Sequence, residues 1–180
     1  MNSTRKDSLA VARALYLTPH ESVTIREHTP DALVVEGRWD ARATASPRHF
    51  HPGQDERFEV LEGRLSFRVD GSERTLGPGE AIDIPRRAAH QVWNEGAEPA
   101  RALWRSEPAG RTAQWFTDLH ELRASGRVGR NGMPGPLAFG VYLTEYADVI
   151  RLAGPQLPIR GALAGLGAIG RLRGYRPREA

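Results

Sequence analysis

Hydrophobic and polar residues alternate with a period of two through most of the chain between residues 21 and 107. This period is typical of β-strands with one buried face, and the Gly, Asn and Asp residues between the alternating runs favour tight turns. Many short strands in one segment predict an all-β fold, either an antiparallel two-sheet sandwich or a closed barrel. The predicted strands are residues 22–27, 32–39, 57–62, 64–69, 81–85, 90–94 and 100–106.

The pattern changes after Pro108, where hydrophobic residues recur at helical spacing. Trp115, Leu119 and Leu122, for example, would share one face of a helix. The predicted elements of this part are a helix at 111–125, a Gly- and Pro-rich loop at 126–136, and helices at 137–153 and 157–176.

These patterns divide the chain into three predicted parts. Residues 1–20 form an N-terminal segment, interpreted as a short amphipathic helix, residues 21–107 form the barrel, and residues 108–180 form a helical C-terminal extension. Arg13 interrupts the apolar stretch near the N-terminus, and no small-residue cleavage site follows it. We therefore expect no secretory signal and a cytoplasmic protein.

The composition narrows the possible chemistry. The 180 residues are 39% hydrophobic and 26% charged, which is ordinary for a globular domain with its own core. The chain has no cysteine, which excludes thiolate zinc sites, disulfides and cysteine nucleophiles. Its net charge of +3 comes from a basic tail, because residues 151–180 hold six arginines and one glutamate. We expect no nucleic-acid partner and no membrane association, since the uncharged run of this tail is too short to span a bilayer.

The first candidate site residues lie in the stretch HFHPGQDERFEV, in which two histidines flank one residue. In a strand, His49 and His51 would point to the same face. Glu56 shares the alternation of Phe58 and Val60, so its carboxylate enters the barrel if those two side chains do. An inward carboxylate without a compensating cation costs on the order of several kcal/mol.

A third imidazole is available at His90, which opens the predicted strand 90–94. Three imidazoles and one carboxylate suit one divalent transition metal, namely Fe, Mn, Ni, Zn, Co or Cu, with coordination positions left for water or substrate. A His-x-His pair alone is weak evidence, because surface and core histidines also occur at that spacing. A vestigial site or a pocket for an organic ligand is the alternative.

These residues resemble the two sequence motifs of the cupin superfamily. His49, His51, Glu56 and Gly63 match the first motif, and Gly79, Pro85, His90 and Asn94 match the second. Two positions depart from the pattern, since Ala43 and Arg87 stand where the family has glycines. The resemblance covers residues 21–107. It implies a double-stranded β-helix (jelly-roll) barrel, usually dimeric, whose mouth holds one metal through His49, His51, Glu56 and His90.

The resemblance implies chemistry on a small molecule. The first hypothesis is a mononuclear metalloenzyme of the dioxygenase or isomerase/lyase type, which acts on a small organic molecule. The alternative is a non-catalytic module that binds a metal or small ligand. The expected partners are a small-molecule ligand or substrate and a second copy of the chain in a homodimer. No general base is evident beyond the ligands, because Glu62 lies at a turn.

Three further features are interpreted as structural. The G-x-G-x-x-G sequence at 165–170 lacks the βαβ unit that a dinucleotide site requires. His120 is expected to pack or to lie on the surface rather than to bind a metal. Trp93 and Trp104 are expected on the outer face of the barrel, against the helices or a partner subunit.

Overall fold

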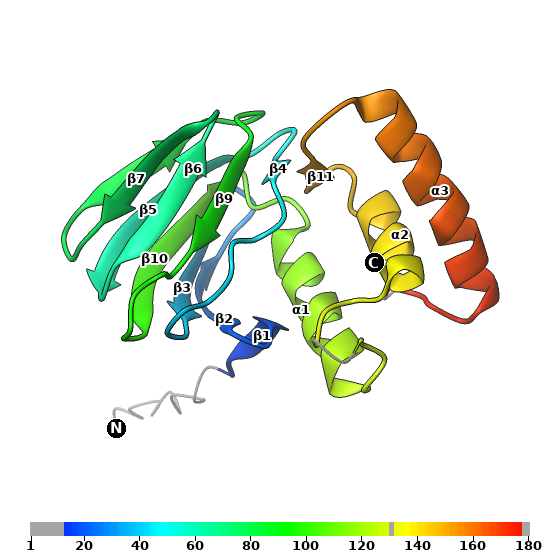
Figure 1. Ribbon diagram of the computed structural model, residues 1–180, viewed down its shortest axis with the longest axis horizontal. Helices are drawn as coiled ribbons and strands as arrows, with labels where there is room; N and C mark the ends of the chain where they lie inside the picture. The colour runs from blue at the N-terminus through cyan, green and yellow to red at the C-terminus, as the bar shows by residue number, and fades with distance from the viewer. Residues whose placement is uncertain (1–12, 130–131, 178–180) are drawn as a thin grey trace, which may run out of the picture.

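The computed structural model describes residues 13–129 and 132–177, and strands make up most of its first hundred residues (Figure 1). They form two antiparallel sheets that enclose a common core, as the alternation predicts. One sheet contains, in order, β1 (Leu15–Thr18), β2 (Glu21–His28), β3 (Leu33–Trp39), β10 (Ala100–Glu107), β5 (Asp55–Glu62) and β8 (Ala81–Ile84). The other contains β11 (Arg151–Leu152), β4 (His49–Phe50), β9 (His90–Trp93), β6 (Leu65–Val69) and β7 (Ser72–Leu76).

The chain passes repeatedly between the two sheets from β3 to β10, which is the double-stranded β-helix, or jelly-roll, arrangement. Along β5, Glu56, Phe58 and Val60 are buried and the residues between them are exposed. The period of two therefore places the Glu56 side chain inside the barrel, as predicted.

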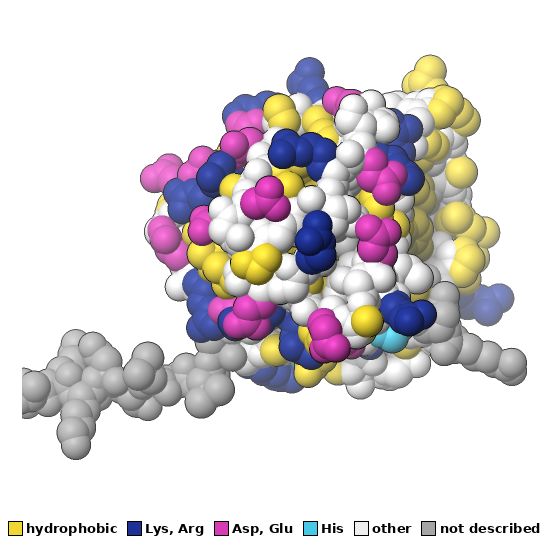
Figure 2. All heavy atoms as spheres, turned by 60° about the vertical axis from the view of Figure 1, so that its left-hand side comes forward, with side chains coloured by type: hydrophobic (Ala, Val, Ile, Leu, Met, Phe, Trp, Pro, Cys, Tyr) yellow, Lys and Arg dark blue, Asp and Glu magenta, His cyan; other side chains and the backbone are white. Residues whose placement is uncertain are grey.

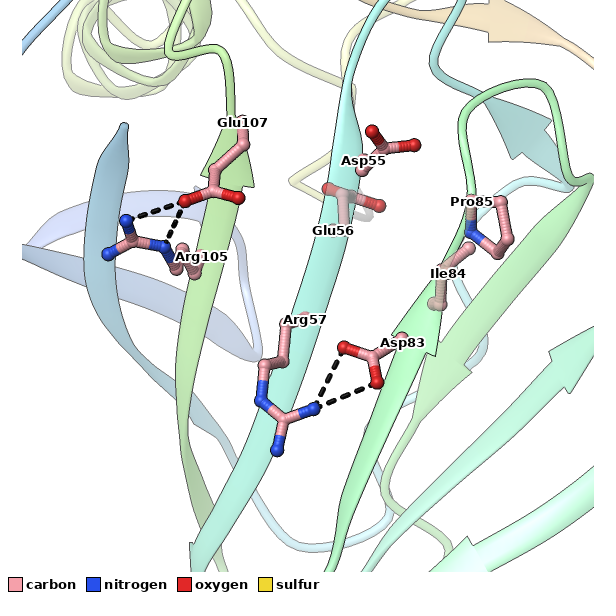
Figure 3. Close-up of a pocket in the computed structure, with 8 residues that line it drawn as sticks. All are labelled: Asp55, Glu56, Arg57, Asp83, Ile84, Pro85, Arg105 and Glu107. Atoms are coloured by element: carbon pink, nitrogen blue, oxygen red, sulfur yellow. Dashed lines mark hydrogen bonds and ion pairs between the residues drawn. The ribbon is translucent and has the colours of Figure 1, made fainter. Parts of the chain in front are cut away.

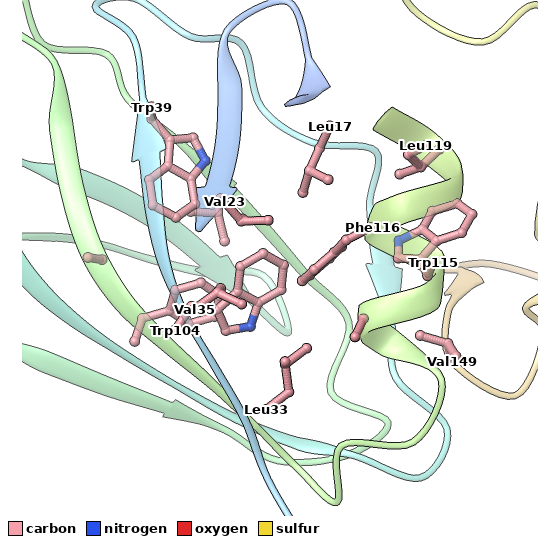
Figure 4. Close-up of a cluster of buried hydrophobic side chains, with 14 of the residues drawn as sticks. Leu17, Val23, Leu33, Val35, Trp39, Trp104, Trp115, Phe116, Leu119 and Val149 are labelled. Atoms are coloured by element: carbon pink, nitrogen blue, oxygen red, sulfur yellow. The ribbon is translucent and has the colours of Figure 1, made fainter. Parts of the chain in front are cut away.

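Three helices follow the barrel: α1 (Thr112–Ala124), α2 (Pro136–Glu145) and α3 (Gln156–Leu172). Figure 1 shows α1 beside the sheets, α2 beyond it and α3 outermost. In Figure 4, Phe116 of α1 points from the helix toward Trp104 and the strands. Their ring centroids are 5.1 Å apart, so α1 continues the core of the barrel.

The helix predicted at 137–153 is shorter than expected. α2 ends at Glu145, and residues 151–152 instead form β11, which pairs with β4. The side chain of Tyr146 is fully buried where the helix ends, and its hydroxyl donates a hydrogen bond to Asp118 of α1. Burial of this tyrosine against α1 turns the chain back toward the barrel.

The N-terminal segment also differs in part from the short helix predicted for it. Residues 1–12 of the helix expected there lie outside the described residues, and residues 15–18 of the same segment form β1. β7 is a further strand that the pattern did not predict, because all but one of its residues are exposed. No helix in the described part of the chain is long and apolar enough to cross a membrane.

The surface carries mixed charge. Figure 2 shows acidic and basic side chains interspersed over the face that it presents. Many of them pair, as Arg101 does with Glu36 and Glu62.

Candidate metal site

The structure brings His49, His51 and His90 together at the mouth of the barrel. His49 lies directly opposite His90 in the ladder between β4 and β9. His51 follows β4 at the spacing that points it to the same side as His49. One ring nitrogen from each of the three lies within 4.8 Å of the other two, and the ring centroids are 4.3 to 5.4 Å apart.

Each imidazole is held by a backbone carbonyl at Nδ1. The distances are 2.7 Å from His49 to Pro47 O, 2.7 Å from His51 to Val149 O and 3.1 Å from His90 to Ala88 O. A carbonyl oxygen can only accept a hydrogen bond, so Nδ1 carries the proton in each ring. This tautomer leaves Nε2 of the neutral ring with a free lone pair, the form in which histidine binds a metal.

Glu56 of β5 completes the group from the opposite sheet. Its Oε1 lies 3.3 Å from Nε2 of His51, and its Oε2 lies 3.1 Å from Nε2 of His90. The indole Nε1 of Trp104 donates a 2.8 Å hydrogen bond to Oε1 and so orients the carboxylate. Glu56 thus contacts two of the three imidazoles, and the third, His49, packs against His90 in the same cluster.

The charges at this point depend on one another. Burial alone would raise the pKa of Glu56, but the three imidazoles outweigh it and lower the pKa to about 2. Burial and repulsion from the other two imidazoles lower the pKa of His49 to about 3. Burial also lowers the pKa of His51, whereas at His90 the Glu56 carboxylate outweighs burial and raises the pKa. Glu56 is thus ionised, and its negative charge favours a cation in the cluster.

Two buried atoms of this cluster lack a hydrogen-bond partner among the described residues, namely Nε2 of His51 and Oε2 of Glu56. Unpaired buried polar atoms are costly, and a cation between them would satisfy both. With metal–ligand bonds of about 2.1 Å, neighbouring ligand atoms around one ion would lie roughly 3.0 to 3.4 Å apart. The nitrogen–oxygen separations of 3.1 and 3.3 Å fall in this range. The three imidazoles therefore fit a transition-metal ion, with the Glu56 carboxylate beside two of them.

The prediction for Trp104 was wrong. Its side chain is buried inside the barrel, stacked on Phe58 and bonded to Glu56, rather than on the outer face. Its position in β10 is inward by the same alternation that places Ala102 and Ser106 in the interior. Trp93, in contrast, is half-buried with Arg68 near its ring.

The sequence did not indicate that the Val149 carbonyl accepts a hydrogen bond from His51. In the helix predicted there, this carbonyl would accept a backbone hydrogen bond within the helix instead. The segment around it supports both histidines of the first motif. Val149 holds His51, and Leu152 of β11 pairs with His49 of β4. Arg87, which stands in place of a glycine, has φ +70° and donates its N–H to the His51 carbonyl. The left-handed backbone explains why glycine suits that position.

The other sequence features have structural roles. His120 is buried beside β1 and accepts a hydrogen bond at Nδ1 from the backbone N–H of Tyr16, far from the cluster. The G-x-G-x-x-G sequence lies within α3 and forms no strand–turn–helix unit.

An apolar cavity of about 120 Å³ adjoins the cluster. His49, His51 and Trp104 lie on its barrel side, and its other walls come mainly from α1, α2 and residues 133–134. A smaller hollow of about 40 Å³ lies between His49, His90 and Trp104. A small molecule in these spaces would lie against the imidazoles.

A larger hollow of about 300 Å³ lies on the outer face of β5, β8 and β10 (Figure 3). Its charged groups are engaged in ion pairs, Arg57 with Asp83, Arg105 with Glu107, and Asp55 with Arg86 outside the hollow. The carboxylate of Glu56 instead faces the histidines. This hollow therefore does not reach the cluster.

Comparison with known sequences identifies the barrel, the same part of the chain that holds the candidate site. The profile of the family described as Cupin domain matches residues 35–105. The Tetracenomycin polyketide synthase protein TcmJ of Streptomyces glaucescens is 37% identical over 60 residues, which are 33% of this chain and 40% of that protein. Quercetin 2,3-dioxygenase of Bacillus subtilis is 27% identical over 71 residues, 39% of this chain and 21% of that enzyme. The similarity thus spans less than half of either relative.

Solved structures share the barrel. The structure of KdgF from Halomonas sp. superimposes with a TM-score of 0.52 at 23% identity, covering 56% of this chain and 92% of that one. An RmlC-like cupin from Shewanella frigidimarina gives a TM-score of 0.53 at 15% identity, covering 62% of this chain and 96% of that one. At these identities the likeness concerns the fold alone.

Proposed function

This chain belongs to the cupin superfamily, and on that premise we propose that its three clustered histidines and Glu56 bind one divalent transition metal. The proposed function is that of a mononuclear metalloenzyme acting on a small organic molecule, by a dioxygenase or isomerase/lyase type of reaction. The observation that carries the proposal is the cluster of three imidazoles oriented by backbone carbonyls, two of which have Nε2 within 3.3 Å of the buried Glu56 carboxylate.

The residues of the chain prepare the site before a substrate arrives. Backbone carbonyls hold the imidazoles in one tautomer, and Trp104 holds the carboxylate, so little reorganisation is needed. When bound, the metal supplies Lewis-acid chemistry, or activation of dioxygen if it is iron. Side chains of α1 and α2 line the adjoining cavity, where they exclude water and bind the apolar part of the substrate.

Metal content tests this proposal. The protein should be purified without chelators or a metal-affinity tag and compared with His51→Ala and with His28→Ala, whose histidine is exposed on β2. We expect about one metal equivalent in the wild type and in the control, and almost none in His51→Ala. The same variant should unfold at a lower temperature, because Glu56 is then left poorly compensated.

Two outcomes would contradict the proposal in different ways. Full metal occupancy in His51→Ala would show that the ligand set is wrong. No metal in any of the three proteins, even after reconstitution, would exclude a metalloenzyme and leave a barrel that binds an organic ligand.

The second candidate, a non-catalytic binding module, is favoured by the small size of the cavity over the site. The two candidates differ in access to the metal. An enzyme should bind azide, or nitric oxide if the metal is iron, at an open coordination position, and the spectrum should change. A closed binding site should give no such change.

The homodimer and the cytoplasmic location expected from sequence stay predictions. Analytical ultracentrifugation of the full chain would test the first.

A further inference from the structure

Glu21, the first residue of β2, is a carboxylate in an apolar setting. Its side chain lines both hollows beside the cluster, together with His49 and Trp104 in each case. Among the described residues it has no hydrogen-bond or ion-pair partner. Buried and half-buried carboxylates are usually paired, so this one invites a functional explanation.

The surroundings of Glu21 set its protonation. The other ionisable side chains that line the two hollows are His49, His51 and His90, and no lysine or arginine is among the described lining residues. In the metal-free protein no cation offsets burial, which raises the pKa of Glu21 to about 7. A carboxyl group of this kind can both take up and release a proton near neutral pH.

The cavity limits what could meet this carboxylate. Its volume of about 120 Å³ is close to that of an engineered apolar cavity of about 150 Å³ that accepts benzene. Aromatic and aliphatic side chains dominate its walls. The space therefore fits a single ring or a group of similar size, with its polar atoms directed to Glu21 and the histidines.

We propose that Glu21 contacts the substrate and exchanges a proton with it, and that the substrate presents a ring-sized apolar group bearing a hydroxyl or enol. This inference rests on the proposed function and adds a proton-transfer residue to it. The carboxylate of Glu21 accepts a proton from an O–H or acidic C–H bond, and the bonding electron pair stays on the substrate. Return of the same proton to another substrate atom restores the carboxylate, so no further reactant is needed.

The first test measures the titration of Glu21 directly, in metal-free protein labelled with ¹³C at the glutamate carboxyl carbons. Wild type is compared with Glu21→Gln and with Glu27→Gln, which removes an exposed glutamate of the same strand. We expect one carboxyl resonance with a midpoint near 7, absent from Glu21→Gln and retained in the control. A Glu21 resonance that titrates between pH 4 and 5 would overturn the proposal.

The second test measures contact with a ligand, with phenol and benzene as probes of the metal-free protein. Glu21→Leu should weaken phenol binding by about tenfold and change benzene binding by less than about twofold, since only phenol can donate a hydrogen bond to the carboxylate. Glu27→Leu should leave both affinities unchanged. Equal changes for the two probes, or no binding of phenol to the wild type, would overturn the proposal.

Metal content is measured in parallel to separate this inference from the proposed function. Glu21→Gln should retain the wild-type metal content, because Glu21 is not one of the four ligands. If the wild type takes up no metal, the proposed function fails, while both tests of Glu21 still give a result because neither uses the metal.

Discussion

At the scale of single residues, Glu56 and Trp104 act as a pair. Glu56 is the one carboxylate in a group of three imidazoles, and Trp104 donates its hydrogen bond to the oxygen nearer His51. The indole also stacks on Phe58, so its position is set by the core of the barrel. Packing in the core therefore determines the direction in which the carboxylate points.

Trp104→Phe tests this link, since it preserves an aromatic ring and removes the N–H donor. We expect a loss of zinc affinity of about 10- to 100-fold, the usual effect of removing a group that orients a ligand. Competition with a chromophoric chelator measures it. Trp93→Phe is the control, because Trp93 is half-buried away from Glu56. Unchanged affinity in Trp104→Phe would mean that the hydrogen bond does not orient the carboxylate.

Glu21 predicts a pH dependence of stability. Its pKa is about 7 in the folded protein against an ordinary value of 4.5, so the folded state holds a proton in this interval that the unfolded state has released. The free energy of unfolding therefore falls as pH rises from 4.5 to 7. The Glu21→Gln variant lacks this pH dependence. Its free energy of unfolding, relative to that of the wild type, should therefore be higher at pH 8 than at pH 5 by roughly 1 to 3 kcal/mol. Urea unfolding of metal-free protein at both pH values measures the difference.

Glu27→Gln is the matched control and should show no such gain. If Glu21→Gln follows the wild type at both pH values, Glu21 does not have the raised pKa.

At the scale of elements, α2 and α3 contact each other through glycines. A Cβ atom built on Gly140 would lie 2.6 Å from Cβ of Leu166 and 2.8 Å from the nitrogen of Gly167. The two backbones can approach this closely because neither glycine has a side chain. Gly161 and Gly165, which have the GxxxG spacing, meet nothing within 4 Å and play no part in this contact.

Alanine substitutions should therefore have opposite effects at two glycines of this helix pair. Gly161→Ala should stabilise the protein by about 0.5 to 1 kcal/mol, because alanine is the better helix former and the site is open. Gly140→Ala should destabilise it by roughly 1 to 3 kcal/mol, because the helices must separate. Thermal unfolding measures both, and hydrogen exchange of α3 locates the effect. A stabilising Gly140→Ala would show that the helices are not in close contact.

At the scale of the whole molecule, the C-terminal extension forms part of the site. Phe116 of α1 packs on Trp104, the Val149 carbonyl holds His51, and β11 supports β4. The cavity beside the histidines has walls from both the barrel and the helices. The barrel alone would thus lack part of the structure that orients its ligands and binds a substrate.

Two truncated chains test this dependence. A chain ending at residue 154 retains Val149 and β11, a chain ending at residue 148 loses both, and each lacks α3. We expect the shorter chain to bind zinc at least about tenfold more weakly, because His51 has lost the partner of Nδ1. Chelator competition measures the ratio. Equal affinity would show that the extension does not orient the ligands.

Local patterns in the sequence were enough to predict an antiparallel β fold, most of its strands and the inward position of Glu56, whereas the shared site of Glu56 and the three histidines was implied by the resemblance to the cupin motifs. The reason is that a period of two assigns each side chain of a strand to a face, and the residue types at those positions limit the chemistry. The inward positions of Glu56 and His90 follow from this rule alone. Trp104 followed the same rule, and the prediction erred by expecting so large a side chain on the outside.

Contacts between residues far apart in the chain could not be predicted in this way. Val149 holds His51 across 98 positions, and Glu21 faces the cavity from a strand with no motif. The shortening of α2 depends on Tyr146 burying its ring against α1, which overrides a helical pattern. These features arise from the packing of helices against the barrel, which depends on the shape of both surfaces and leaves no periodic signal in either segment.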